Sequence, residues 1–147
     1  MSIIERLTED MKAAMKQGDK DRVGTIRQLR AQLNNARIEL GRDLTDDDAI
    51  KVLTNAAKKR KEAIEMYEKA GREDLVAKEK AELAVIQEYL PQQLSKEELE
   101  AIIDAVIKDV NATSMKDMGR VMGQVMQQVR GRADGKQVQE LVRSKLQ

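Results

Sequence analysis

Five polar side chains in the last third of the sequence have the chemistry needed to hold a phosphate backbone. They are Arg120, Gln124, Arg130, Arg132 and Lys136. Arginine and lysine neutralise phosphates, and arginine and glutamine also hydrogen-bond to base edges. Arg120 and Gln124 are four residues apart and so share one stripe of a helix, whereas Arg132 and Lys136 flank the start of the next helix, whose free N–H groups attract phosphate. The pattern predicts a nucleic-acid-binding surface, with an ordinary solvated basic face as the alternative.

Three glycines accompany these side chains and are candidates for close approach by a neighbouring backbone or partner: Gly119, Gly123 and Gly131. Glycine costs about 1 kcal/mol relative to alanine inside a helix, so two glycines one turn apart indicate that something approaches the helix closely. One interpretation is a tight helix–helix crossing within the chain, followed by an ordinary turn. Another is a protein–protein module in which a helix of a partner docks on the Met- and Gly-rich segment 118–130.

A second basic patch, Lys58, Lys59 and Lys61, surrounds Arg60. Four consecutive helical residues cannot share one face, so at most two or three of them could meet one ligand. We expect Arg60 to lie on a helix–helix seam, with its head group emerging or pairing with Glu79. Because the chain has two Tyr and no Phe or Trp, recognition by base stacking is not expected.

The sequence gives little support for catalysis by the isolated chain. It contains no His and no Cys, which removes the commonest general base and metal ligand and all thiolate chemistry. Ser2, Ser95 and Ser114 are explained as helix caps, and no phosphate-binding loop is present. The three aspartates at 46–48 could bind Mg²⁺, but a helix N-terminus explains them better. We therefore expect no catalytic residue, no metal and no cofactor.

The elements that must position these residues are all helical. The core must be aliphatic, because hydrophobic residues make up 41% of the chain and aromatic residues only 1%. Apolar residues recur every three or four positions between capping signals, and no alternating run predicts a strand. About seven helices result, grouped as an N-terminal helical hairpin module (1–92) and a small C-terminal three-helix module (93–147), with Pro91 near the boundary. The second module is near the lower size limit for independent folding.

Charge is distributed unevenly along the chain. The net charge is only +1, which argues against a globally basic nucleic-acid-binding protein. Segment 114–147 nevertheless holds seven Lys/Arg and three Asp/Glu, a net of +4, so positive charge is concentrated at the tail. No signal peptide or membrane-spanning stretch is apparent, and we therefore expect a cytoplasmic location and no membrane partner.

Several segments resemble a known family. They are Tyr-Leu-Pro-Gln-Gln-Leu-Ser at 89–95, Asp-Met-Gly-Arg-Val-Met-Gly at 117–123 and Arg-Gly-Arg-Ala-Asp at 130–134, with Ile-Ile-Glu-Arg-Leu at 3–7 and Lys-Arg-Lys-Glu at 59–62. The chain resembles the YqeY-like proteins over its whole length. This resemblance implies an all-helical fold whose C-terminal part is similar to the tail domain of GatB, a component of the aminoacyl-tRNA amidotransferase, where the tail contacts tRNA.

The resemblance implies a free-standing, non-catalytic adaptor that binds tRNA or a tRNA-handling protein complex. It does not imply amidotransferase chemistry, because the kinase and amidase parts of that enzyme have no counterpart in 147 residues. Carbon–nitrogen ligase activity with glutamine as amido-N-donor stays a further hypothesis, resting on family association alone.

Overall fold

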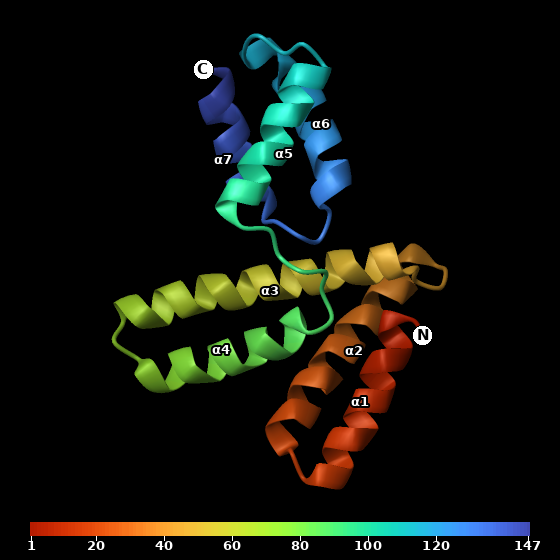
Figure 1. Cartoon of the computed structure of the whole chain (residues 1–147). Coiled ribbons are helices and arrows are strands. Elements are labelled where there is room, and N and C mark those ends of the chain that lie inside the picture. Colours follow the sequence, from red (N-terminus) through yellow and green to blue (C-terminus); the bar gives the residue numbers. More distant parts are fainter. The chain divides into compact units, whose positions relative to one another are not determined.

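The computed structural model describes all 147 residues, and it confirms the all-α prediction. Seven α-helices and one 3₁₀ turn account for the regular structure, and no strand is present (Figure 1). The elements are α1 (Ile3–Gln17), α2 (Lys20–Leu40), α3 (Asp46–Lys69), α4 (Glu73–Gln87), α5 (Lys96–Asp109), η1 (Met115–Asp117), α6 (Met118–Val129) and α7 (Gly135–Leu146).

The helix boundaries follow from capping chemistry. The Ser2 hydroxyl accepts the Glu5 N–H at the start of α1, and α1 ends at Gly18, whose φ of 73° is the left-handed conformation that favours glycine. Gly41 ends α2 in the same way. At the start of α3, Asp48 completes a capping box with Thr45 and forms an ion pair with Arg42. These contacts agree with the helix N-terminus explanation of the aspartates at 46–48.

Two helix ends are tightened by short-range hydrogen bonds. Helix α4 ends at Gln87, and the N–H groups of Glu88 and Tyr89 donate to carbonyls three residues earlier. Such tightening is common where a helix must stop before a proline, here Pro91. The Ser114 capping box starts the 3₁₀ turn η1, and α6 follows only after it.

The chain divides into two compact units, Met1–Leu90 and Pro91–Gln147. The predicted domains, 1–92 and 93–147, differ by two residues, because the carbonyls of Pro91 and Gln92 both accept hydrogen bonds from side chains of the second unit.

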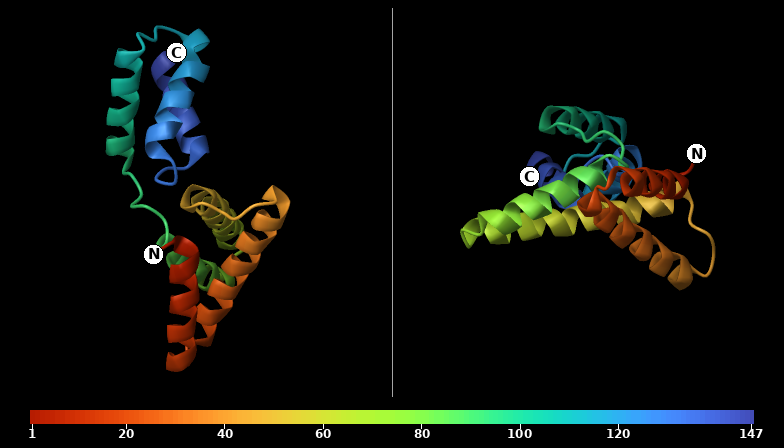
Figure 2. Two further views of the ribbon diagram at one scale, coloured as in Figure 1. Left: turned by 90° about the vertical axis from the view of Figure 1, so that its right-hand side faces the viewer. Right: turned by 90° about the horizontal axis from the view of Figure 1, so that it is seen from below.

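The first unit consists of two helical hairpins. Helices α1 and α2 lie side by side and antiparallel, as do α3 and α4 (Figures 1 and 2). The core between them is aliphatic apart from one tyrosine, and its buried residues are Ile3, Leu7, Ile26, Leu29, Leu33, Ala49, Leu53, Ala56, Ala57, Ile86 and Tyr89. The absence of aromatic residues from the rest of this core lets the helices pack closely through alanine and branched aliphatic side chains.

The side chain of Arg60 joins three helices of this unit. Nε of Arg60 on α3 lies 3.3 Å from Oε2 of Glu82 on α4, and the two side chains are only 11% and 15% exposed. Nη2 of Arg60 also donates to Oε1 of Gln28 on α2, at 2.9 Å. Arg60 therefore has the structural role expected from its place on the seam. The partner suggested from the sequence, Glu79, is wrong, because Glu82 on the next turn of α4 is the residue that reaches it.

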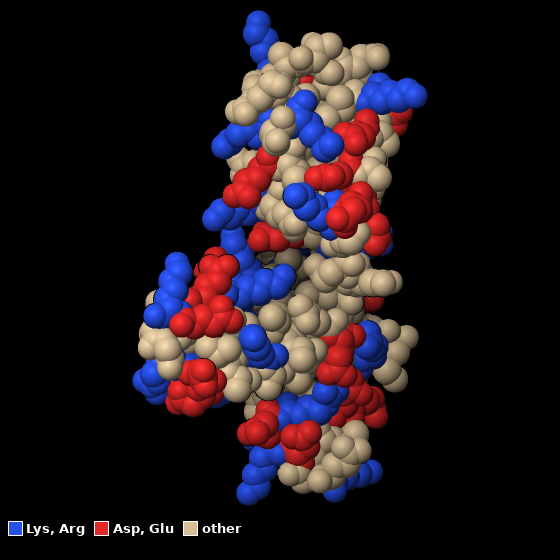
Figure 3. Space-filling model, turned by 60° about the vertical axis from the view of Figure 1, so that its left-hand side comes forward, with Lys and Arg blue, Asp and Glu red and all other residues tan.

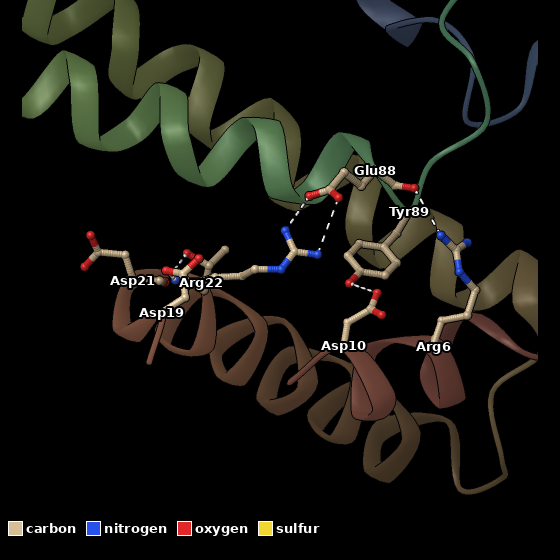
Figure 4. Close-up of polar contacts among 8 residues, drawn as sticks. Arg6, Asp10, Asp19, Asp21, Arg22, Glu88 and Tyr89 are labelled. Atoms are coloured by element: carbon tan, nitrogen blue, oxygen red, sulfur yellow. Dashed lines mark hydrogen bonds and ion pairs between the residues drawn. The ribbon is translucent and has the colours of Figure 1, made fainter. Parts of the chain in front are cut away.

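A polar network holds the end of α4 against α1 and α2 (Figure 4). The Tyr89 hydroxyl donates to Asp10, and the guanidinium of Arg6 lies 5.0 Å from the centre of the Tyr89 ring. Arg22 donates to both carboxylate oxygens of Glu88, at 2.7 and 3.4 Å. Burial, together with the hydrogen bond to Asp10, raises the pKa of Tyr89, so the phenol stays neutral and acts as a structural donor.

The second unit packs three helices around a core dominated by valine. Its buried residues are Leu99, Ile103, Val106, Val121, Val125, Val129, Ala133, Val138, Val142 and Leu146. Partly buried side chains of α5 and α6 complete the packing, among them Ile102, Met118, Met122 and Met126. Flexible Met side chains suit the irregular gaps that remain between branched residues.

The ion pair in the first unit leads to a stability prediction. Replacing Glu82 with alanine leaves the Arg60 charge in a nearly buried site without its partner, and we expect a loss of about 2–3 kcal/mol in the free energy of unfolding. Glu79→Ala is the matched control on the same helix, and its effect should stay below about 0.5 kcal/mol. Urea unfolding followed by circular dichroism measures both. Equal losses in the two variants would contradict this assignment.

Candidate nucleic-acid interface

Helix α6 has one buried and one exposed face. Val121, Val125 and Val129 point into the core, and the opposite face exposes Gly119, Arg120, Gly123, Gln124 and Gln127. Arg120 and Gln124 thus lie together on the outer surface of the helix, as their spacing of four residues predicts.

The two helical glycines are open to solvent. A Cβ atom added at Gly119 or Gly123 would meet nothing within 4 Å. The tight crossing within the chain that their spacing indicated is therefore absent, because the core of the second unit is built on the valine stripe instead. Approach by a partner from outside remains the other interpretation of these glycines.

The chain leaves α6 through a type II turn at 129–132. Arg130 has φ −50° and ψ 122°, Gly131 has φ 74°, and the Arg132 N–H donates to the Val129 carbonyl at 2.7 Å. A type II turn needs positive φ at its third residue, and glycine adopts this without strain. We expected Gly131 to permit close approach, and the turn conformation provides a second reason for glycine at this position.

Segment 91–94 is fastened to this turn by three hydrogen bonds. The Leu94 N–H donates to the Arg132 carbonyl at 2.8 Å, and Nε2 of Gln93 donates to the Gly131 carbonyl at 2.8 Å. In the opposite direction, Nε of Arg132 donates to the Gln92 carbonyl at 3.2 Å. Two segments that carry the family resemblance, 89–95 and 130–134, therefore meet in space although Gln92 and Arg132 are 40 residues apart in sequence.

Reasoning from the sequence did not include Gln92, Gln93 and Leu94 among the site residues. They follow a proline and precede a helix cap, so they had the pattern of a connecting loop. The available signal was the presence of the two glutamines in a segment that carries the resemblance. Their role depends on a contact between distant segments, and local periodicity contains no information about such a contact.

The other basic residues of the site are exposed but sit beside acidic groups. Nη2 of Arg120 donates to Asp117 at 3.0 Å, and the Arg120 side chain is 54% exposed. The N–H groups of Thr113 and Ser114, together with Arg120, hold the pKa of the Asp117 carboxyl below its usual range. Asp134 caps α7 by accepting the Lys136 N–H at 3.1 Å. A carboxylate thus occupies part of the helix N-terminus whose free N–H groups we expected to attract phosphate.

Within the second unit the positive tail is balanced by α5. Residues 91–147 hold nine Lys/Arg and eight Asp/Glu, a net of +1. Lys145 on α7 pairs with Asp104 on α5 at 2.9 Å, and basic and acidic side chains alternate over the face that Figure 3 shows. Attraction of a polyanion would therefore depend on local contacts at the turn rather than on a broad positive field.

The second basic patch lies in the first unit, on α3. Lys58, Lys59 and Lys61 are all exposed, whereas the Arg60 side chain between them is nearly buried in the ion pair with Glu82. The structure does not bring this patch together with the residues of α6 and its turn in one unit. It stays a separate, secondary candidate for binding.

Comparison with known proteins identifies the family. The family model described as "Yqey-like protein" matches residues 4–146. The chain belongs to this family. The YqeY-like match thus covers both units, including every residue proposed for the interface.

Two kinds of relative are similar to this YqeY-like chain. Altered inheritance of mitochondria protein 41, mitochondrial, of Pyrenophora tritici-repentis is 31% identical over 97% of this chain and 82% of its own length. The GatE component of the Glutamyl-tRNA(Gln) amidotransferase of Thermococcus gammatolerans is 39% identical over 71% of this chain, but the match covers only 17% of that component. The same component of Thermococcus sibiricus is 34% identical over 78% of this chain and 19% of its own length.

These relatives relate the chain to part of a tRNA amidotransferase component. The resemblance noted in the sequence named GatB, whereas the amidotransferase relatives described above are GatE. The name of the fungal relative includes the word mitochondrial. A cytoplasmic location for the present chain therefore stays a prediction. None of the helices combines the length and apolar character required of a bilayer-spanning segment.

The glycines of α6 and of the turn should respond oppositely to alanine. Gly123→Ala adds a Cβ into open space within a helix, so we expect the free energy of unfolding to rise by about 0.5–1 kcal/mol. Gly131→Ala forces a Cβ onto a residue at φ 74° and should lower it by about 1 kcal/mol. Thermal and urea unfolding check both variants. A destabilising effect of Gly123→Ala would show that the face of α6 is already covered in the protein.

Proposed function

We propose that this chain is a non-catalytic helical adaptor that binds tRNA, or a complex that handles tRNA, through the second unit. The interface consists of the exposed face of α6 and the basic turn at 130–134, with Arg120, Gln124, Arg130, Arg132 and Lys136 as the contacting residues. The observation that carries the proposal is the hydrogen-bonded junction of segments 91–94 and 130–132, which presents basic side chains from a turn of defined conformation. Relatedness to part of a Glutamyl-tRNA(Gln) amidotransferase supports tRNA as the ligand.

The structure also supports the non-catalytic part of this proposal. The hydroxyls of Ser2, Ser95 and Ser114 each accept a backbone N–H at the start of a helix. A hydroxyl held in this way has a structural role that accounts for its presence. Amidotransferase chemistry is therefore not part of the proposal.

Binding of this kind should be weak and sensitive to salt. At most four cations line the interface, and each phosphate contact contributes a slope of about −0.7 to −0.9 in a plot of log K against log salt concentration. Because the second unit has a net charge of only +1, its long-range attraction for RNA is small.

Charge reversal at the interface tests the proposal. In titrations with a tRNA pool at low salt, we expect Arg120→Glu/Lys136→Glu to reduce affinity at least about tenfold. The slope of log K against log salt concentration should become shallower by the equivalent of about one to two phosphate contacts. Lys12→Glu/Lys16→Glu on α1 changes the net charge equally and is the matched control, because both lysines are exposed in the first unit. The proposal fails if the unmodified protein does not bind tRNA, or if both double variants weaken binding equally.

The open glycines of α6 favour a second candidate function, the docking of a helix from another protein. Gly119 and Gly123 leave the α6 backbone accessible, and close approach of two helices is the common use of glycines one turn apart. Gly119→Gln/Gly123→Gln would cover this surface without entering the core. Loss of a bound protein that the unmodified chain retains after nuclease treatment would favour docking. Retention of that protein by the variant would exclude this role for the glycines.

A further inference from the structure

The side chain of Arg132 is held by only one of its three nitrogens. Nε donates to the Gln92 carbonyl at 3.2 Å, and neither Nη atom makes a hydrogen bond within the chain. The guanidinium group is planar, so holding Nε restricts the directions that the two Nη groups can take. A phosphate accepts two parallel N–H bonds from such a fork. The residue is half-buried, and much of its side-chain entropy is therefore lost before any ligand binds.

The Gln92 carbonyl is itself held in place. Nε2 of the neighbouring Gln93 donates to the Gly131 carbonyl at 2.8 Å and to the Pro91 carbonyl at 3.1 Å. The Leu94 N–H fixes the other side of the segment through the Arg132 carbonyl. The Gln92 carbonyl orients Arg132. Gln93 holds the segment that contains this carbonyl against the turn that contains Arg132.

We infer that Arg132 is the bidentate phosphate-binding residue of this interface and that Gln93 is a positioning residue that acts through it. The ligand group is a phosphodiester of the RNA backbone. The inference rests on the proposed function, and it adds that the basic residues of the interface bind in different ways. Arg132 supplies geometry as well as charge, whereas Arg120 stands on an exposed helix face and supplies charge alone.

Arginine-to-lysine substitutions separate geometry from charge. Lysine keeps the positive charge but has only one side-chain nitrogen. It therefore cannot bind the Gln92 carbonyl through one nitrogen and a phosphate through two others, as arginine can. We expect Arg132→Lys to reduce tRNA affinity about tenfold, the equivalent of one hydrogen bond to a charged group. Arg143→Lys, a control on the exposed surface of α7 outside the interface, should leave it unchanged.

A double-mutant cycle tests the role of Gln93. Gln93→Met keeps a similar size but removes both donated hydrogen bonds, and we expect it to reduce tRNA affinity about fivefold in the unmodified protein. In the R132K background the same change should have no further effect, because the fork that Gln93 positions is already lost. Circular dichroism and thermal unfolding verify that each variant is folded. Hydrogen exchange at the amides of 131–133 should be faster in Gln93→Met than in the unmodified protein.

The outcomes separate this inference from the proposed function. If the unmodified protein does not bind tRNA, both fail. If charge reversal weakens binding but Arg132→Lys leaves tRNA affinity unchanged, as Arg143→Lys does, the proposed function stands and bidentate recognition by Arg132 is wrong. If Gln93→Met weakens binding equally in the two backgrounds, or if it leaves hydrogen exchange at 131–133 unchanged, Gln93 is not a positioning residue for Arg132.

Discussion

The candidate interface depends on the hydrogen bonds between segments 91–94 and 130–132. A turn between two helices would otherwise project into solvent with its carbonyls bonded only to water. Here the Arg132 carbonyl accepts the Leu94 N–H, and the Gly131 carbonyl accepts the Gln93 amide. Backbone groups near a core need such partners, and meeting this need ties the start of the second unit to its centre. The orientation of Arg132 follows from the same contacts.

Packing and the proposed binding use different faces of α6. The valine stripe supplies the contacts that hold α5, α6 and α7 together, so the opposite face is under no packing constraint. Glycine on an unconstrained helical face lowers stability without any gain inside the chain. Such a local cost is expected at positions that serve binding rather than folding. This reasoning connects the open space at Gly119 and Gly123 with the polar side chains beside them.

The charge distribution confines positive potential to a small part of the proposed interface. The excess of positive charge in segment 114–147 is offset by the acidic helix α5, by the pair of Lys145 with Asp104 and by the caps Asp117 and Asp134. The polar pairs of the first unit act differently, because Arg60–Glu82 and Arg22–Glu88 join helices to one another. Similar residue types thus join helices in one unit and lie on the surface proposed for binding in the other, according to how far each is buried.

The sequence by itself determined the helices and most of their ends. Caps such as Ser2, Thr45 and Ser95, glycines such as Gly18 and Gly41, and the helical spacing of apolar residues act over a few positions, so they can be recognised locally. The exposure of Arg120 and Gln124 followed from the same periodicity. Only the tertiary structure decided that Glu82 rather than Glu79 pairs with Arg60, that nothing in the chain covers Gly123, and that Gln92 and Gln93 hold Arg132. Each of these depends on which surfaces of distant segments meet, and that is set by the packing of whole helices rather than by the pattern within any one of them.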